Sequence, residues 1–325
     1  MAEEQNVEEE YENLKNSKFK QAKLPGWRPV SSFKKTTIMF FSFGGIFITL
    51  GIILLIVCNN VEEVSIRYDK YCENFKKQYP NNTCNITFDI SEKMEKKIMI
   101  YYQLTGFYQN HRRYVKSKND DQLNGKFMTL AEMIDNEECD PVITNADMGK
   151  NRSYNDTYDL NPDDLAIPCG LIAKSFFNDN FYDWKIIDKN GKETHFKPNE
   201  KNIASDADKE IKFDNYNLSQ QWIDMTDEHF IVWMKPAALP TFRKLWARID
   251  DRDLEEGSKV NVKIEDNFEV SSFDGKKHLI LTTTNSFGGK NLFIGISYIV
   301  LGVISLSFGV IFVFGAHIRR KNHLK

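Results

Sequence analysis

The sequence lacks a clear excess of charge of either sign. Its 325 residues include 43 Lys and Arg against 46 Asp and Glu, which gives a formal net charge of -3. Domains that bind nucleic acids usually carry a strong positive charge, so this balance excludes a broadly basic nucleic-acid-binding protein. A chain of this length has room for one or two domains.

The sequence also lacks the motifs that mark common enzyme chemistry. It has no Gly-x-Ser-x-Gly nucleophile elbow, no phosphate-binding loop and no His-Glu-x-x-His metal pair. The six histidines are scattered and never stand at ligand spacing. A calcium loop with Gly191 at its sixth position would begin at Ile186 and end at Lys197, and neither of these is a carboxylate ligand. We therefore expect no enzyme activity, no metal site and no cofactor.

Two long segments lack charged residues altogether. Residues 36 to 58 are 23 consecutive uncharged residues, and residues 291 to 316 are 26 more. As a helix the shorter segment would be about 35 Å long, which exceeds the roughly 30 Å of the hydrocarbon core of a bilayer. The sequence therefore predicts a membrane protein with two transmembrane helices, at 36–58 and 291–316.

The basic residues that flank these two segments predict their orientation. Residues 16 to 35 carry six Lys and Arg and no acid. The second segment is followed, again without an acid, by Arg319, Arg320, Lys321 and Lys325. Both tails, residues 1–35 and 317–325, are therefore expected in the cytoplasm. The segment 59–290 is expected on the exoplasmic side.

Two features of the segment 59–290 agree with an exoplasmic location. Acceptor sites for N-glycosylation, Asn-x-Ser/Thr, occur only there. They are Asn81, Asn85, Asn151, Asn155 and Asn217. Four of the five cysteines also lie there, which fits an oxidising compartment, whereas Cys58 lies in the first transmembrane segment.

The four cysteines of this segment are Cys72, Cys84, Cys139 and Cys169, and they allow three disulfide pairings. We favour Cys72 with Cys84 and Cys139 with Cys169, because each pair encloses a polar, turn-rich stretch that burial alone would not order. In the chain-entropy model these bonds stabilise the fold by roughly 3 and roughly 3.5 to 4 kcal/mol. The alternative is that the four residues are free, buried thiols.

Several stretches of the segment 59–290 have the pattern of β-strands. Asn190-Gly191 separates residues 184–187 from residues 193–196, which is typical of a β-hairpin. Residues 259–264 alternate between polar and apolar side chains, and Asp274-Gly275 leads on to another apolar stretch at 279–281. We expect both of these stretches to be strands with one buried face.

One stretch of the same segment has the period of a helix. The apolar residues Phe242, Leu245, Trp246 and Ile249 recur at the spacing of one helical face, which predicts a helix. Together these patterns predict an α+β membrane protein. Its two transmembrane helices flank a β-rich antiparallel exoplasmic domain with short helices.

The second transmembrane segment has small and polar residues on one helical face. Asn291, Gly295, Tyr298, Gly302, Ser305, Gly309 and Ala316 fall within a sector about 80° wide at about 100° per residue. Small residues let another helix approach closely. Either the two transmembrane helices of this chain pack on each other, or Gly295, Gly302 and Gly309 receive a helix of a partner.

The segment 101–118 is rich in aromatic and basic residues. They are Tyr101, Tyr102, Phe107, Tyr108, His111, Arg112, Arg113, Tyr114 and Lys116. The exoplasmic location argues against an RNA ligand. The segment is either an amphipathic helix whose arginines pair with acids of the same domain, or a surface that binds another protein, where Tyr and Arg are favoured. The candidate interface residues are Tyr108, Arg112, Arg113 and Tyr114.

Five segments of the sequence resemble the cell-cycle-control-protein 50 / ligand-effect-modulator family. In order they are FKQAKLPGWRP (19–29), FYQNHRRYVKS (107–117), IPCGLIAKSFFND (167–179), FIVWMKPAALPTFRKLW (230–246) and SFGGKN (286–291). Members of this family are accessory β-subunits of type-IV P-type ATPases, which flip phospholipids. The resemblance implies two cytoplasmic termini and a glycosylated, disulfide-bonded, β-rich ectodomain, as the residues themselves suggest.

The resemblance also implies a function and a partner. The chain would be a non-catalytic, chaperone-like subunit that forms a heterodimer with the ATPase catalytic subunit among membrane lipids. It would allow the ATPase to leave the endoplasmic reticulum for the Golgi, endosomes or plasma membrane, and it would support the transport cycle. The alternative from topology alone is a two-span ligand-gated channel subunit, but the second segment offers a glycine-rich, uncharged face instead of a polar pore lining. An anchored exoplasmic hydrolase would need a catalytic site that the sequence does not offer.

Overall fold

The structure is a computed structural model that describes residues 11–21, 23, 32–78, 82–285 and 289–322. The chain divides into two units. The first, which we call the helix unit, consists of Met1–Leu55 and Phe293–Lys325. The second, which we call the globular domain, consists of Ile56–Leu292. In the basic segment before the first span, residues 22 and 24–31, which include Trp27, lie outside the described residues.

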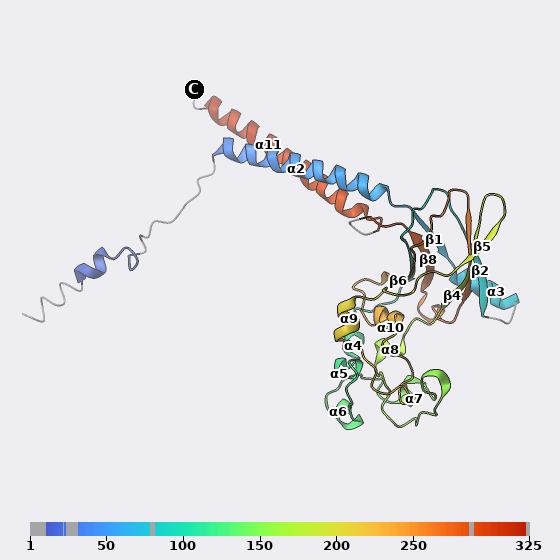
Figure 1. Ribbon diagram of the computed structural model, residues 1–325. Coiled ribbons are helices and arrows are strands. Elements are labelled where there is room, and N and C mark those ends of the chain that lie inside the picture. Colours follow the sequence, from blue (N-terminus) through green and yellow to red (C-terminus); the bar gives the residue numbers. More distant parts are fainter. Residues whose placement is uncertain (1–10, 22, 24–31, 79–81, 286–288, 323–325) are drawn as a thin grey trace, which may run out of the picture. The chain divides into compact units, whose positions relative to one another are not determined.

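The helix unit contains the two long apolar helices that the sequence predicts (Figure 1). They are α2 (Phe33–Asn59) and α11 (Leu292–Asn322). Both are long and apolar enough to cross a membrane, yet most of their apolar side chains are not covered by protein. A helix that is apolar all round and still uncovered is typical of a lipid environment. The chain is thus a two-span membrane protein.

The helices α2 and α11 pack against each other through the glycines of α11. A Cβ atom placed on Gly302 would lie 2.6 Å from Cγ1 of Ile48 and 3.0 Å from the carbonyl oxygen of Gly44. Gly295 and Gly309 face Leu55 and Phe41 in the same way, and these contacts recur every seven residues along both antiparallel helices. Close approach of this kind needs residues without side chains.

These contacts correct one of the two interpretations of the glycine-rich face. The face at Gly295, Gly302 and Gly309 is already covered by α2, so it does not offer a free groove to a helix of a partner. Ser305, on the same face, donates a hydrogen bond from Oγ to the carbonyl oxygen of Phe40 at 2.9 Å. The small residues therefore serve the contact between the two helices of this chain.

The globular domain is built on two antiparallel sheets of four strands each (Figure 1). In spatial order the first sheet consists of β1 (Glu63–Arg67), β8 (Lys276–Thr282), β3 (Ile98–Thr105) and β6 (Thr241–Ile249). The second consists of β2 (Thr83–Asp89), β7 (Lys259–Glu265), β4 (Asn180–Ile187) and β5 (Glu193–Phe196). The predicted β-rich antiparallel domain with short helices is confirmed.

The inner faces of the two sheets share one aromatic core. Trp246 of β6 and Phe181 of β4 meet edge to face, with ring centroids 4.9 Å apart. Along β7 buried side chains alternate with half-buried ones, as predicted for a strand with one buried face. The strand β8 differs, because Leu279, Ile280 and Leu281 are all fully buried. Its outer face is covered as well, so the prediction of a single buried face was wrong for this strand.

The predicted helix around Phe242 and Ile249 was also wrong, because these residues belong to strand β6. A β-bulge explains the misleading period. Opposite the step from Ile100 to Tyr101 in β3, the strand β6 has one extra residue, so that Trp246 and Ala247 are both buried. The extra residue shifts the alternation by one position, so that the buried apolar residues Phe242, Trp246 and Ile249 stand four and three positions apart, as on a helical face.

The predicted hairpin between β4 and β5 is confirmed. Its loop is longer than a two-residue turn, because the amide of Asp188 donates to the carbonyl oxygen of Lys192. Within it the amide of Gly191 donates to the carbonyl oxygen of Asp188, and Gly191 has a φ of 80°. Only this position of the loop needs the left-handed backbone that glycine provides.

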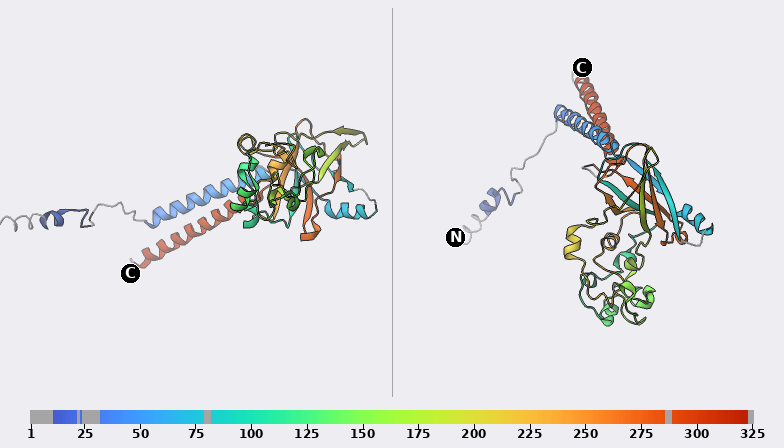
Figure 2. Two further views of the ribbon diagram at one scale, coloured as in Figure 1. Left: turned by 90° about the horizontal axis from the view of Figure 1, so that it is seen from below. Right: turned by 45° about the vertical axis from the view of Figure 1, so that its right-hand side comes forward.

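Two long connections of the globular domain carry most of its short helices, which gather at one end of the sheets (Figure 2). Between β3 and β4 lie α4 (Arg112–Lys116), α5 (Asp120–Leu123), α6 (Leu130–Asp135), α7 (Asn145–Met148) and α8 (Leu171–Lys174). Between β5 and β6 lie α9 (Asp206–Ile211) and α10 (Glu228–Trp233). Capping boxes at Thr129 and Thr144 begin α6 and α7. Helices this short depend on such caps and on packing, because a single turn is unstable alone.

The structure confirms the favoured disulfide pairing. Cys72 of α3 (Asp69–Gln78) is bonded to Cys84 of β2, with their Cα atoms 5.3 Å apart. Cys139 is bonded to Cys169 at a Cα separation of 5.6 Å. The first bond fixes α3 to the second sheet. The second bond closes a loop within the connection that carries α4 to α8, where little sheet is present to order the chain.

Candidate partner-binding site

Two of the segments that resemble the family, 107–117 and 230–246, lie side by side at the surface of the globular domain. The side-chain amide of Asn110 donates to the carbonyl oxygen of Ala238 at 2.8 Å. Pro240 accepts hydrogen bonds from the backbone amides of residues 106 and 107. Between these contacts the side chains of Tyr108 and Leu239 are 63% and 67% exposed. We call the surface formed by Tyr108, His111, Arg112, Arg113 and Leu239 the docking surface.

The same segments also have buried side chains that fix the docking surface to the core. Phe107 contacts the rings of Trp233, Phe242, Phe268 and Phe273, with ring centroids 5.5 to 6.4 Å apart. Gln109 is fully buried, and its Oε1 accepts a hydrogen bond from the amide of Ala237 at 2.9 Å. Tyr108 is therefore exposed between two side chains that are fixed inside the protein, so its backbone is held in place.

Tyr114 does not belong to the docking surface, which corrects its assignment as an interface residue. Its side chain is only 9% exposed, and its hydroxyl forms a 2.7 Å hydrogen bond with Oγ of Ser175. Burial raises the pKa of this hydroxyl above its usual value. On α4 the side chain of Tyr114 points about 160° away from that of Arg112 and about 100° away from that of Arg113, and it faces inward.

The end of the segment 107–117 is tied to the second disulfide. Oγ of the buried Ser117 donates to the carbonyl oxygen of Cys139 at 2.9 Å and accepts from the amide of Leu171 at 2.8 Å. A Cβ atom on Gly170 would lie 2.1 Å from the carbonyl oxygen of Ser117. Only glycine fits at this contact, and Gly170 also has a φ of 98°. The disulfide is thus connected, through Ser117, to the end of the segment that carries the docking surface.

Arg112 and Arg113 are both exposed, and in the described part of the chain neither has a hydrogen-bond or ion-pair partner. The sequence left open an amphipathic helix whose arginines pair with acids of the same domain. The structure does not form these pairs, and Tyr101 and Tyr102 lie in β3 instead of a helix. Two adjacent unpaired guanidinium groups beside exposed Tyr108 and Leu239 have the composition that protein interfaces favour.

A buried lysine holds the loop that carries Leu239. Nζ of Lys244 donates to the carbonyl oxygens of Val232 at 2.9 Å and Trp233 at 3.3 Å, and it also contacts that of Lys235. Val232 and Trp233 are the last residues of α10, where carbonyl groups lack partners within the helix and a cation is favourable. Burial lowers the pKa of Lys244 to about 7. Lys244 was not predicted from the sequence as part of the site, although two-residue alternation from Phe242 to Trp246 would place it facing inward.

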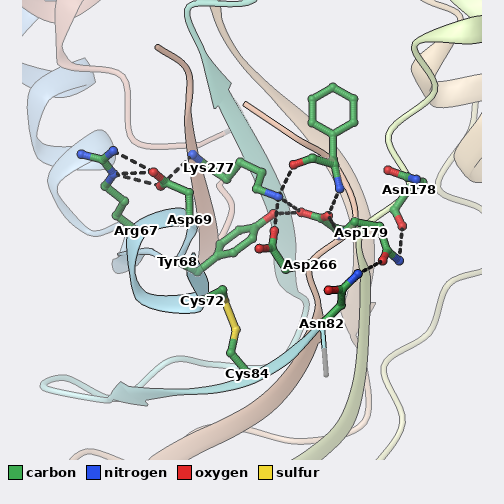
Figure 3. Close-up of polar contacts among 12 residues, drawn as sticks. Arg67, Tyr68, Asp69, Cys72, Asn82, Cys84, Asn178, Asp179, Asp266 and Lys277 are labelled. Carbon is green, nitrogen blue, oxygen red and sulfur yellow. Dashed lines mark hydrogen bonds and ion pairs between the residues drawn. A yellow bond between two sulfur atoms is a disulfide. The ribbon is translucent and has the colours of Figure 1, made fainter. Parts of the chain in front are cut away.

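A second buried lysine joins the two sheets (Figure 3). Nζ of Lys277, in β8, lies 2.7 Å from the carboxylate of Asp179 and also contacts Asp266. Asp179 directly precedes β4 and Asp266 directly follows β7, so the carboxylates come from the second sheet. Tyr68, which directly follows β1, donates a hydrogen bond from its hydroxyl to Asp179 at 2.7 Å. We call these four residues the buried network.

The buried network was not predicted from the sequence, because its members lie up to 209 positions apart. Burial raises the pKa of the Asp179 carboxyl, and the neighbouring Lys277 opposes that shift. Burial also raises the pKa of the Tyr68 hydroxyl well above its usual value. A charge pair with these surroundings can stabilise a structure only if all its hydrogen bonds are formed. The network therefore has a structural role, in the junction between the sheets.

The described glycosylation acceptors are all exposed. Asn85 lies on the outer face of β2, while Asn151, Asn155 and Asn217 lie in the connections that carry the short helices. Asn81 lies outside the described residues. Exposure is required for a bulky glycan, so nothing in the packing of these four side chains opposes their modification.

A metal site is not found among the residues that the structure describes, where no three or more His, Cys, Asp or Glu side chains come together. The stretch considered as a calcium loop forms the turn between β4 and β5, and Oδ1 of Asp188 accepts hydrogen bonds from the amides of Asn190 and Lys192. That carboxylate is engaged in shaping the turn.

Comparisons with known proteins show one family across most of the chain. The model of the LEM3 (ligand-effect modulator 3) family / CDC50 family matches residues 54–322. Cell cycle control protein 50A of Mus musculus is 36% identical, over 91% of this chain and 87% of the mouse protein. ALA-interacting subunit 3 of Arabidopsis thaliana is 35% identical, over 92% of this chain and 86% of the plant protein. Cell cycle control protein 50C of Macaca fascicularis is 32% identical, over 89% of each chain.

Proposed function

The chain belongs to the LEM3 (ligand-effect modulator 3) family / CDC50 family, and from this premise we propose that it is a non-catalytic accessory subunit of a P-type ATPase that flips phospholipids. The observation that carries the proposal is the extent of the match, which includes the whole globular domain and α11. A relative of similar length is named for its interaction with ALA. In this proposal the chain forms a heterodimer with the ATPase catalytic subunit, and membrane lipids surround both.

The proposal includes a topology. The tails 1–35 and 317–325 are cytoplasmic, and residues 36–58 and 291–316 cross the membrane. Residues 59–290 are exoplasmic. The basic flanks, the two disulfides and the exposed glycosylation acceptors support this arrangement. The orientation brings the docking surface to the same side of the membrane as the exoplasmic loops of the ATPase.

The proposed activity follows from binding alone. An accessory subunit that binds one conformation of its ATPase more tightly than another stabilises that conformation by mass action. Binding to the newly made ATPase would favour its folded form and its export from the endoplasmic reticulum. Binding during transport would favour one state of the cycle. Neither effect needs a catalytic group on this chain.

Co-purification from native membranes tests the proposed function. The tagged full-length chain should bring down a much larger chain that mass spectrometry identifies as a P-type ATPase, in a one-to-one complex. A ring of like chains without an ATPase would favour the channel alternative and would contradict the proposal.

The orientation gives a separate prediction. Tags at both termini should resist protease added outside sealed cells, because both tails are cytoplasmic. A tag inserted in the exposed loop between β4 and β5 should be removed by the same treatment. Loss of either terminal tag in sealed cells would show that the orientation is wrong.

Replacement of the two arginines tests the docking surface. Arg112→Ala and Arg113→Ala should each lower co-purification of the ATPase several-fold, because each removes an unpaired cation from the docking surface. The melting temperature should hardly change, since exposed residues without partners contribute within about 0.5 kcal/mol to stability. The control Lys93→Ala removes an exposed cation outside the docking surface and should leave co-purification unchanged.

Two results would contradict this assignment. Normal co-purification by both variants would place the interface elsewhere. A joint loss of folding and binding in both variants would show that the segment 107–117 has only a structural role.

A further inference from the structure

Two aromatic rings form an exposed pair at the end of the globular domain that carries the short helices. The side chains of Phe127 and Tyr216 are 60% and 39% exposed, and their ring centroids are 5.4 Å apart. The backbone holds them together, because residues 124 and 214 form a parallel β-bridge and the amide of Asp214 donates to the carbonyl oxygen of Leu123 at 2.9 Å. Both rings thus stand fixed side by side in solvent. The pair presents a small apolar surface that is open to an occupant.

The glycosylation acceptor Asn217 directly follows Tyr216, and its turn is rigidly built. Its amide donates to Oε1 of Gln221 at 2.8 Å. Gln221 is fully buried, and its Nε2 donates to Oδ1 of Asn215 at 2.7 Å and to the carbonyl oxygen of Ile223 at 3.1 Å. The backbone of Asn217 is therefore held in place from inside the domain.

The side chain of Asn217 uses its oxygen for hydrogen bonds within the turn and leaves its nitrogen, Nδ2, without a hydrogen bond to the described residues. Its Oδ1 accepts hydrogen bonds from the amide of Ser219 at 3.0 Å and from Oγ of Ser219 at 2.7 Å. Among the described residues, nothing forms a hydrogen bond with its Nδ2, and the residue is exposed. N-glycans are attached through this nitrogen, and the hydroxyl of Ser219 is the one that the acceptor pattern requires.

We propose that Asn217 carries an N-linked glycan whose first N-acetylglucosamine covers the ring pair of Phe127 and Tyr216. One face of this sugar consists of C–H groups and its acetyl group ends in a methyl, so it presents apolar, weakly positive hydrogens to the negative faces of aromatic rings. Covering the rings removes apolar surface from water. Attachment at the residue next to Tyr216 supplies the sugar at high effective concentration.

The attachment needs a donor that the secretory pathway supplies, a lipid diphosphate-linked oligosaccharide. A bond forms between Nδ2 of Asn217 and C1 of the first sugar, the bond from C1 to the diphosphate oxygen breaks, and Nδ2 loses one proton. The lipid diphosphate leaves. This step rests on the exoplasmic orientation in the proposed function, because the transfer takes place on that side of the membrane.

The other described acceptors lack this surface. Asn85 stands on the outer face of β2, and no exposed ring pair among the described residues includes a neighbour of Asn85 in sequence. A glycan on Asn85 would therefore extend into solvent without covering an aromatic pair of the protein. Asn85 serves as a matched control, since it is an exposed acceptor on the same domain.

The test combines mass spectrometry with melting temperatures of the full-length chain expressed in eukaryotic cells. Glycopeptide analysis should find Asn217 modified. Asn217→Gln should lower the melting temperature by about 2 to 4 °C, a measurable shift for a domain of this size. In a Phe127→Ala background the same replacement should cause little further change, because the surface that the sugar covers is gone. Asn85→Gln should give equal shifts in both backgrounds.

Partial digestion provides an independent measurement. An endoglycosidase that leaves the first N-acetylglucosamine on asparagine should preserve the melting temperature, whereas complete removal of the glycan should lower it as Asn217→Gln does.

Three results would overturn the proposal. Glycans on other acceptors with Asn217 unmodified would refute this site alone and leave the proposed function intact. A shift for Asn217→Gln that is equal with and without Phe127 would show that the sugar does not cover the rings, which would then be free for another protein. Absence of glycans from every acceptor would contradict the exoplasmic orientation as well.

Discussion

Replacing Asp179 by alanine should destabilise the globular domain by about 3 to 5 kcal/mol, the usual cost of removing one partner of a buried ion pair. The carboxylate of Asp179 is completely buried, and the side chain of Lys277 is only 2% exposed. Without Asp179 the lysine keeps one carboxylate, Asp266, and loses the other. A loss of this size is a large fraction of the stability of an average domain.

The hydrogen bonds of Asp179 explain why the loss should be so large. Its Oδ2 accepts from Nζ of Lys277 and from the hydroxyl of Tyr68, each at 2.7 Å. Its Oδ1 accepts from the backbone amides of Asn267 and Phe268, each at 2.6 Å. Alanine accepts none of these bonds, so the buried hydroxyl of Tyr68 would lose its acceptor and Lys277 would keep only Asp266 and the carbonyl oxygen of Phe268. The junction between the sheets would be the first part of the fold to weaken (Figure 3).

The measurement is thermal or denaturant unfolding of the purified chain, followed by a probe of the globular domain. Asp89→Ala is the matched control, because Asp89 forms an ion pair with Lys259 in which both side chains are mostly exposed, and such pairs contribute at most about 1 kcal/mol. Asp179→Asn keeps the shape and some hydrogen bonds but removes the charge, so it should fall between the two. If Asp179→Ala is no worse than Asp89→Ala, the buried network does not hold the sheets together.

The sequence predicted the parts of the fold that depend on local pattern. Charge-free length identified the two transmembrane helices, and alternation with turn residues identified the β4–β5 hairpin and β7. The prediction was wrong at β6, where the bulge at Trp246 gives buried residues the spacing of a helix. A bulge depends on the partner strand β3, which lies about 140 residues earlier in the chain, so no local pattern could reveal it.

The candidate site was predicted only in part, for a similar reason. The segment 107–117 stood out by composition, but the sequence did not show which side chains face outward. The structure separates exposed Tyr108 and Arg112 from buried Tyr114, and it adds Leu239 from the other connection. Whether an aromatic residue is buried depends on neighbours that are distant in sequence, such as Ser175 for Tyr114. The two arginines could be proposed as interface residues from the sequence, but only the structure shows that they lack partners among the described residues.

Replacing either cysteine of the second disulfide should destabilise the globular domain by about 2 to 5 kcal/mol, the usual range for a native disulfide of a secreted domain. Cys139 and Cys169 are 30 positions apart, and the loop they close contains little sheet. Both residues are buried, so serine would also place a hydroxyl in the core without water. The carbonyl oxygen of Cys139 accepts the hydrogen bond of Ser117, which connects this loss to the docking surface.

Cys139→Ser and Cys169→Ser should therefore behave alike, and the double replacement should be little worse than either, because one bond is lost in all three variants. Unfolding measurements should show this equality, and glycan processing in cells should show all three variants retained early in secretion. Cys58→Ala is the control, since Cys58 is a free cysteine of α2 and its loss breaks no bond. The chain-entropy model attributes the loss to a less constrained unfolded state. A strong difference between the two single variants would mean that Cys139 and Cys169 are not bonded to each other in the native protein.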